Sequence, residues 1–145
     1  MTRGWREEPA ARGGCQCGAV RYSVAAGPAK SVVCHCRMCQ RATGNAFAPL
    51  HEVPAAAVTW AGSPAEWASS DIARRGFCAT CGTPLYYRSG DTVELMAGTL
   101  APPFAFRPVE QIAVESRRAW VHDLATLPGI ATPPDWRVAS RQAEE

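Results

Sequence analysis

The chain has 145 residues, about the size of a single domain, and its 47% hydrophobic and 19% charged residues exclude a disordered chain. Its net charge is only +2 with both signs interspersed, so we expect neither nucleic acid nor an anionic membrane as a partner. No apolar stretch reaches the roughly 20 residues of a membrane-spanning helix. The first fourteen residues lack the apolar segment of a secretory signal, which predicts a protein of the reducing cytoplasm.

The composition predicts short strands and turns, because twelve glycines and twelve prolines leave little room for long helices. Residues 1–12 form a polar segment that we expect to be a flexible N-terminal arm. From residue 18 to residue 25, apolar and polar residues alternate with the period of two that is typical of a strand. The other elements expected in this half are strands over 30–33, 46–52, 58–60, 66–69 and 73–77, a loop or helical turn over 41–45, and a helical turn over 55–57.

The second half of the chain continues the same pattern. Strands are predicted over residues 85–88, 92–98, 112–116 and 119–121, with an irregular Pro-rich tail after residue 127. The first two are joined by Ser89-Gly90-Asp91, a typical hairpin turn. No helix longer than about two turns is expected. The sequence therefore predicts one all-β domain over residues 13–145, in which metal sites supplement a modest core.

The seven cysteines fall into three tight groups. They form a C-x-C pair, a C-x-C-x-x-C triplet and a C-x-x-C pair: Cys15 and Cys17; Cys34, Cys36 and Cys39; Cys78 and Cys81. Their odd number excludes a complete set of intramolecular disulfides, and a reducing compartment disfavours disulfides in any case. Cysteines two or three residues apart suit a metal ion better, because their thiolates can converge on it.

Two pairs and a triplet indicate two zinc sites with different roles. A structural zinc site takes four protein ligands, whereas a catalytic site has three and leaves a position for water or substrate. Glycine follows each pair, at Gly18 and Gly82, where a tight turn lets backbone N–H groups point at the sulfur. Other divisions stay open: the triplet joined by a distant cysteine or by His35, His51 or His122, or thiols that are redox-active or simply buried.

Few other residues stand out as functional candidates. In an extended segment the side chain of His35 points away from the cysteines on either side, so we expect it to support the site or face solvent instead of binding metal. His51 and His122 are expected to be surface histidines. Three single carboxylates are expected to be solvated charges and not general bases: Glu52, Glu66 and Asp71.

Three blocks of the sequence carry a resemblance to a known family. They are Gly13-Gly14-Cys15-Gln16-Cys17-Gly18-Ala19-Val20-Arg21-Tyr22, Cys34-His35-Cys36-Arg37-Met38-Cys39-Gln40-Arg41-Ala42-Thr43-Gly44 and Phe77-Cys78-Ala79-Thr80-Cys81-Gly82-Thr83-Pro84-Leu85. Two later segments fit the same family: Ala97-Gly98-Thr99-Leu100 and Ala119-Trp120-Val121-His122. In this order the blocks resemble the glutathione-dependent formaldehyde-activating enzyme family, which also includes centromere protein V. The resemblance runs from about Gly13 to Pro128.

The resemblance implies an antiparallel, tent-like β fold that binds two zinc ions. By matching motif, the structural zinc would be held by Cys15, Cys17, Cys78 and Cys81, and the catalytic zinc by Cys34, Cys36 and Cys39. It also implies carbon–sulfur lyase activity, in which formaldehyde and glutathione form S-hydroxymethylglutathione. Glutathione or another small thiol, and an aldehyde or a thiol adduct, would then be the partners.

The chemistry of a three-thiolate zinc site fits such a reaction. Its fourth position can take a substrate thiol and lower the pKa of that thiol, or it can polarise a carbonyl. Three thiolates make the site negative, which weakens its Lewis acidity and favours the first role. The alternative is a non-enzymatic zinc module for protein interaction or for thiol or metal sensing, which a closed and inert second zinc would favour. The identity of the thiol, the direction of reaction and the oligomeric state stay open.

Overall fold

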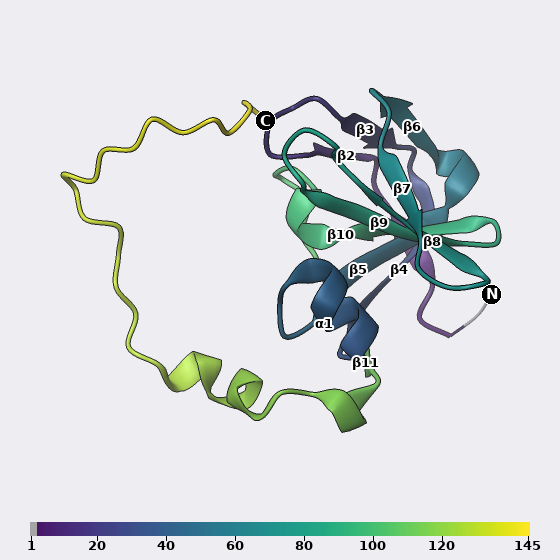
Figure 1. Cartoon of the computed structure of the whole chain (residues 1–145). Coiled ribbons are helices and arrows are strands. Elements are labelled where there is room, and N and C mark those ends of the chain that lie inside the picture. Colours follow the sequence, from purple (N-terminus) through teal and green to yellow (C-terminus); the bar gives the residue numbers. More distant parts are fainter. Residues whose placement is uncertain (1–2) are drawn as a thin grey trace.

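The computed structural model describes residues 3–145, which fold into two mainly antiparallel β-sheets (Figure 1). The larger sheet has the strand order β1-β4-β5-β10-β9-β8-β7, and β11 pairs in parallel with β4. Its strands are β1 (Arg6–Glu8), β4 (Gly27–Cys34), β5 (Ala48–Pro54), β7 (Ala65–Ala68), β8 (Ala73–Phe77), β9 (Pro84–Ser89), β10 (Thr92–Met96) and β11 (Glu110–Ile112). The smaller sheet has the order β2-β3-β6, with β2 (Ala11–Gly14), β3 (Arg21–Val24) and β6 (Val58–Ala61). The prediction of an all-β fold is confirmed.

Helical structure is sparse in the described part of the chain. The one α-helix there is α1 (Arg37–Thr43), and the remaining turns are 3₁₀: η1 (Ala55–Ala57), η2 (Ala97–Thr99), η3 (Val114–Ser116) and η4 (Ala119–Thr126). None of these helices is long and apolar enough to cross a membrane. The hairpin expected at Ser89-Gly90-Asp91 is present, since Thr92 of β10 pairs with Ser89 of β9.

The main hydrophobic core is formed by side chains from both sheets. The ring of Trp60 in the smaller sheet lies 5.2 Å from that of Tyr22 and 5.1 Å from that of Tyr86 in the larger sheet, centroid to centroid. Alternation along β10 turns Val93 and Leu95 into this core. On the opposite face of the larger sheet a second cluster gathers beside α1; its buried members are Val32, Cys34, Cys39, Ala48, Leu50 and Met96.

The structure differs from the sequence expectations at both ends of the domain. Residues Arg6–Glu8, which fall in the expected flexible arm, pair as β1 with the start of β4. Three charged residues show no apolar alternation, so only the backbone pairing reveals this strand. The strand expected over 119–121 is wrong, because these residues begin the 3₁₀ helix η4. The strand expected over 112–116 ends at Ile112, and η3 follows it.

The C-terminal segment runs away from the sheets and then returns. Residues 127–145 contain no helix or strand, as predicted, and Figure 1 shows them as a wide yellow arc that ends beside β2 and β3. The N–H of Ala143 donates to the carbonyl of Gln16 at 2.7 Å, and the guanidinium of Arg21 donates to the carbonyl of Glu144 at 3.0 Å. The end of the chain is therefore held against the turn between Cys15 and Cys17.

Candidate metal centres

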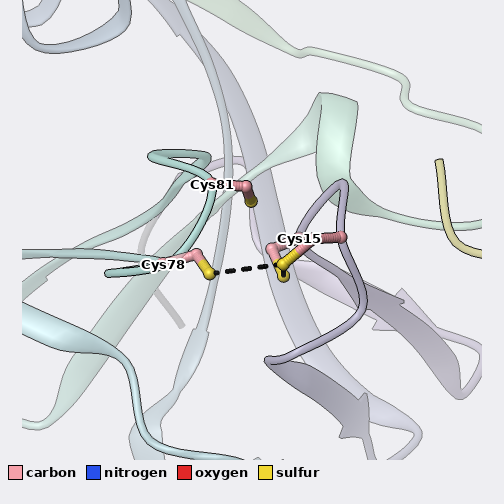
Figure 2. A group of neighbouring side chains, drawn as sticks. Cys15, Cys78 and Cys81 are labelled. Carbon is pink, nitrogen blue, oxygen red and sulfur yellow. Dashed lines mark hydrogen bonds between the residues drawn. The ribbon is translucent and has the colours of Figure 1, made fainter. Parts of the chain in front are cut away.

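Four cysteines from two distant segments meet where the smaller sheet joins the larger one. Cys15 and Cys17 follow β2, whereas Cys78 and Cys81 lie between β8 and β9. Their sulfur atoms all lie within 4.8 Å of one another, with 3.6 Å from Cys15 to Cys17 and 3.8 Å from Cys17 to Cys78. Figure 2 shows the sulfurs of Cys15, Cys78 and Cys81 turned toward one another. We call these four residues the quartet.

Tight turns beside the quartet follow from the two glycines that the sequence places there. Gly18 has φ +80° and Gly82 has φ +79°. This is a left-handed backbone conformation that residues other than glycine rarely adopt. The first turn lets the N–H of Val20 donate to the sulfur of Cys15 at 3.3 Å. The second is closed by the N–H of Gly82, which donates to the carbonyl of Cys78 at 2.8 Å. The prediction of tight turns is confirmed at both pairs, and that of an N–H group donating to sulfur is confirmed at the first.

The remaining three cysteines converge on the opposite face of the larger sheet. Cys34 ends β4, Cys36 is the N-cap of α1, and Cys39 lies in its first turn. The sulfur of Cys36 accepts a hydrogen bond from the N–H of Cys39 at 3.3 Å, which is the usual role of an N-cap side chain. All three sulfur atoms lie within 4.8 Å of one another. We call these residues the triplet.

Both groups have the donor chemistry that zinc requires, and the quartet also has the sulfur spacing. Zinc binds thiolate sulfur at about 2.3 Å in a tetrahedron, so that two of its sulfur ligands lie about 3.8 Å apart. The sulfur distances of 3.6 Å and 3.8 Å in the quartet match this value. In the triplet no fourth His, Cys, Asp or Glu of the described residues completes the group. The fold therefore brings the seven cysteines together as one group of four and one group of three.

Arg75 of β8 is the charged neighbour of the triplet. Its Nη2 donates to the sulfur of Cys39 at 3.5 Å, and its guanidinium lies 5.0 Å from the centroid of the Tyr87 ring. The hydrogen bond from Cys34 and the one from Arg75 together lower the pKa of the Cys39 thiol to about 5, although burial opposes this. The hydrogen bond to Cys39 and burial raise the pKa of Cys34. Cys39 thus ionises more readily than Cys34.

Directly paired residues on successive strands form a polar row across the face of the sheet that carries the triplet. In strand order from β4 to β7 they are Lys30, Glu52, Glu94, Tyr87, Arg75 and Trp67. Met96, two residues beyond Glu94 and therefore on the same face, packs with Cys34 and Cys39. Burial, and then the charge of Glu52, raise the pKa of Glu94 to about 7. Glu52, which was expected to be a solvated charge, is half-buried and lies between Lys30 and Glu94 in this row.

Gln40 connects α1 to the segment that follows β11. Its side-chain amide donates to the carbonyl of His35 at 2.6 Å and to the carbonyl of Ser116 at 2.9 Å, while its amide oxygen accepts from Arg118 at 2.9 Å. Gln40 itself is only 4% exposed. These bonds between buried and partly buried groups fix the helix that carries Cys39, because a buried amide left unpaired is costly.

The three histidines lie outside both cysteine groups. His35 is buried, and its Nε2 is 2.9 Å from Oε1 of Gln111, so it faces the interior and not solvent. The expectation of a surface position is wrong for His51, which is 2% exposed, hydrogen-bonds Ser31 at 2.9 Å and has its pKa lowered by burial. The expectation of a surface position is confirmed for His122, which is exposed.

Two residues near the sites escaped the sequence analysis or were misjudged by it. Arg75 is one of many arginines, so its residue type alone does not mark it as functional. The sequence signal that could have found it is its place in β8, where it follows the buried Ala73 by two residues and therefore points to the same face as Ala73. Glu66 is not an isolated charge: it accepts hydrogen bonds from Tyr86 at 2.8 Å and from Arg74 at 2.7 Å, and from Arg88 at 3.1 Å. Burial opposes the ionisation of Glu66, but these donors outweigh it and lower its pKa.

Comparisons with known proteins agree with this geometry. The family model described as glutathione-dependent formaldehyde-activating enzyme matches residues 10–116. Among solved structures, a Rhodobacter sphaeroides protein from a structural genomics programme is similar in fold, with a TM-score of 0.54 and 18% identity. The match covers 69% of this chain and 98% of that one. No curated protein sequence matches. Because the family model spans well over half of the sequence, the chain belongs to the glutathione-dependent formaldehyde-activating enzyme family.

Proposed function

We propose that the protein is a zinc-dependent carbon–sulfur lyase that forms or cleaves the adduct of a small thiol with formaldehyde. Glutathione is the thiol that the family description indicates. The observation that carries this proposal is the triplet, where three thiol donors converge without a fourth protein donor among the described residues. Catalytic zinc sites have this composition, which leaves one position for substrate. Seven free thiols also favour a reducing compartment such as the cytoplasm.

Two zinc ions would be held by separate sets of residues. A structural ion fits the quartet, Cys15, Cys17, Cys78 and Cys81, and a catalytic ion fits the triplet, Cys34, Cys36 and Cys39. When bound at the triplet, zinc supplies a coordination position that favours the thiolate form of a substrate thiol at neutral pH. The negative charge of the three cysteines favours this role over strong polarisation of a carbonyl.

The residues around the triplet determine its charge and its rigidity. Arg75 places a positive charge beside Cys39, which offsets part of the repulsion among neighbouring thiolates. Gln40 and the N-cap of Cys36 hold α1 in place, which keeps Cys36 and Cys39 beside Cys34. Such preorganisation lowers the cost of ordering the site at the moment of binding.

The reaction itself is an addition of a thiol, RSH, to H₂C=O that gives RS–CH₂–OH. The sulfur donates an electron pair to the carbonyl carbon, the carbon–sulfur bond forms, and the carbonyl π pair moves to oxygen. The proton that leaves the thiol ends on that oxygen, so no oxidant or reductant is needed. The reverse reaction breaks the same bond. Since the uncatalysed addition is already fast, a rate enhancement has to be measured at equilibrium.

Magnetisation-exchange NMR of formaldehyde and glutathione, with and without the zinc-loaded protein, is the appropriate experiment. We expect the protein to accelerate exchange between free formaldehyde and the adduct. Cys36→Ser is expected to abolish the acceleration, because it removes one of three ligands. Met38→Ser is a matched control: Met38 lies on α1 between two ligands but is 59% exposed and contributes no metal donor.

Each outcome of this experiment has a clear reading. Acceleration that survives in Met38→Ser and is lost in Cys36→Ser supports the proposal. Acceleration that survives in both variants would mean that the triplet does not carry the chemistry. If the parent protein, with two zinc ions bound, neither binds a thiol nor accelerates exchange, the proposed activity is wrong.

A further inference from the structure

A basic pocket of about 320 Å³ lies between α1 and the start of η4. The helix contributes Arg37, Gln40 and Arg41 to its lining, and the segment at the start of η4 contributes Arg118 and Trp120. No cysteine of the triplet or the quartet lines it, so this hollow is separate from both candidate metal centres. Its volume falls at the lower end of the range of about 300–1,000 Å³ that small-molecule sites occupy.

Three guanidinium groups line this pocket, and no carboxylate does. None of the ion pairs among the described residues involves Arg37, Arg41 or Arg118. Arg37 and Arg41 are four residues apart on α1, a spacing at which like charges repel each other and destabilise a helix. The fold thus gathers positive charge in a hollow without a counter-charge from the protein, and an anionic ligand would offset the repulsion.

Two of the three guanidinium groups are held by one buried amide. The amide oxygen of Gln40 accepts one hydrogen bond from Nη1 of Arg37 and another, at 2.9 Å, from Nε of Arg118. A neutral oxygen does not cancel their charges, and most of their N–H donors stay available to a ligand. Gln40 is itself fixed, because it is 4% exposed and its amide nitrogen donates to the carbonyls of His35 and Ser116. The two positive charges are therefore held beside each other, which reduces the ordering that a ligand has to bring about.

An unpartnered aromatic ring lines the same pocket. Trp120 follows Arg118 by two residues and is 51% exposed. It takes part in none of the aromatic pairs of the described residues. Indole rings stack on the flat faces of nucleic-acid bases, and guanidinium groups bind phosphate oxygens through paired hydrogen bonds. The pocket therefore offers one group for a base and three for a phosphate.

We propose that this pocket binds a nucleoside monophosphate, with its phosphate against Arg37, Arg41 and Arg118 and its base against Trp120. A phosphate monoester carries a charge of about −1.5 to −2 at neutral pH and three strong acceptor oxygens, so it can pair with several guanidinium groups at once. A hollow of this size suits a single nucleotide, whereas a nucleic-acid strand needs a groove that follows its backbone. The site is additional to the proposed lyase activity and lies on the helix that carries two cysteines of the triplet.

A purely structural role for these arginines makes a different prediction. If Arg37 and Arg118 only fasten the start of η4 to α1 through Gln40, the pocket has no ligand. Arg41 takes no part in that contact, since the oxygen of Gln40 accepts from the other two arginines. Replacing Arg41 therefore tests ligand binding and leaves the link between the two segments in place.

Calorimetric titration of the zinc-loaded protein with adenosine 5′-monophosphate, adenosine and inorganic phosphate separates the contributions of charge and ring. We expect the monophosphate to bind at least about tenfold more tightly than adenosine, which lacks the charge, and than inorganic phosphate, which lacks the ring. Arg41→Met is expected to weaken the monophosphate at least about fivefold and to leave adenosine unchanged. Trp120→Leu is expected to weaken both of these ligands by the same factor, because each loses the same stacking contact.

Arg137→Met is the matched control, because it removes the same charge from an exposed arginine outside the pocket and is expected to keep the affinity of the parent. Equal losses in Arg41→Met and Arg137→Met would show a general effect of net charge and would overturn the inference. A parent protein that does not bind the monophosphate, or binds it no better than adenosine, would also overturn it. Saturating glutathione is expected to leave the affinity for the monophosphate unchanged, since the pocket shares no residue with the triplet. Competition between the two ligands would contradict a separate site.

Discussion

The thiol of Cys81 offers a sharp test of the quartet, because this residue is exposed while its three partners are buried or half-buried. Replacing Cys81 by serine changes one atom at the surface and removes no buried apolar contact. A surface substitution of this kind normally changes the free energy of unfolding by less than about 0.5 kcal/mol. A large effect would therefore have to come from a bound metal ion.

The size of that effect can be worked out from the ligand count. Structural zinc stabilises small zinc-binding peptides by about 10–16 kcal/mol, so one of four thiolate ligands accounts for about 3 kcal/mol. For a chain of this length, 1 kcal/mol corresponds to a shift in Tm of about 2–4 °C. Cys81→Ser is therefore expected to lower Tm by about 6–12 °C. The loss is large because the quartet connects β2 of the smaller sheet to β8 and β9 of the larger one.

Differential scanning calorimetry of zinc-loaded protein, with metal analysis of the same samples, measures both quantities. Thr80→Ser is the matched control, since Thr80 is exposed in the same loop and has no place in the quartet. We expect the control to melt within about 2 °C of the parent and to keep both zinc ions. A Cys81→Ser protein that keeps all its zinc and melts like the control would refute the reasoning.

Two further predictions concern the fold around the sites. A methyl group at Gly76 would lie 2.1 Å from the ring of Tyr86, so Gly76→Ala is expected to destabilise the protein by about 1–3 kcal/mol, measured by denaturant unfolding; an unchanged midpoint would contradict this packing. Burial lowers the pKa of His51, so the folded state binds its proton less readily than the unfolded chain does. The stability that His51 contributes is therefore present above its unfolded pKa of about 6.5 and is lost as the pH falls through the lower folded value. Tm measured from pH 7 to pH 5 should fall less steeply in His51→Leu than in the parent, whereas the exposed His122→Gln should keep the parent slope; equal slopes in all three would exclude this role.

The strands could be predicted from the sequence where apolar residues alternate. Val93 and Leu95 of β10 show this pattern clearly, and the strand begins where it was expected, although it ends at Met96 and the last two residues of the expected strand, Ala97 and Gly98, belong to η2. The segment Ala119–Thr126 has similar β-forming residues but forms 3₁₀ turns, because a strand needs a partner that local sequence cannot supply. Strand β1 shows the reverse, since its three charged residues form a strand only by pairing with β4.

The cysteine groups were predictable because their spacing along the chain already limits how they can meet. The surroundings of the triplet were not. Arg75 approaches Cys39 only because β8 lies three strands from β5 in the larger sheet, an order that no local pattern specifies. The same holds for Glu94, whose raised pKa depends on burial and on Glu52 across the β5–β10 pair. Residues that act through long-range neighbours emerge only with the strand order.

The central claim is that the chain holds two zinc ions of unequal kind, and zinc-edge anomalous diffraction from crystals of the zinc-loaded protein tests it most directly. We predict two peaks per chain. One lies about 2.3 Å from the four sulfur atoms of Cys15, Cys17, Cys78 and Cys81, and the other lies at that distance from the sulfur atoms of Cys34, Cys36 and Cys39, with a fourth ligand that does not come from the protein. A single peak per chain, or a second zinc ion enclosed by four protein ligands, would contradict the account.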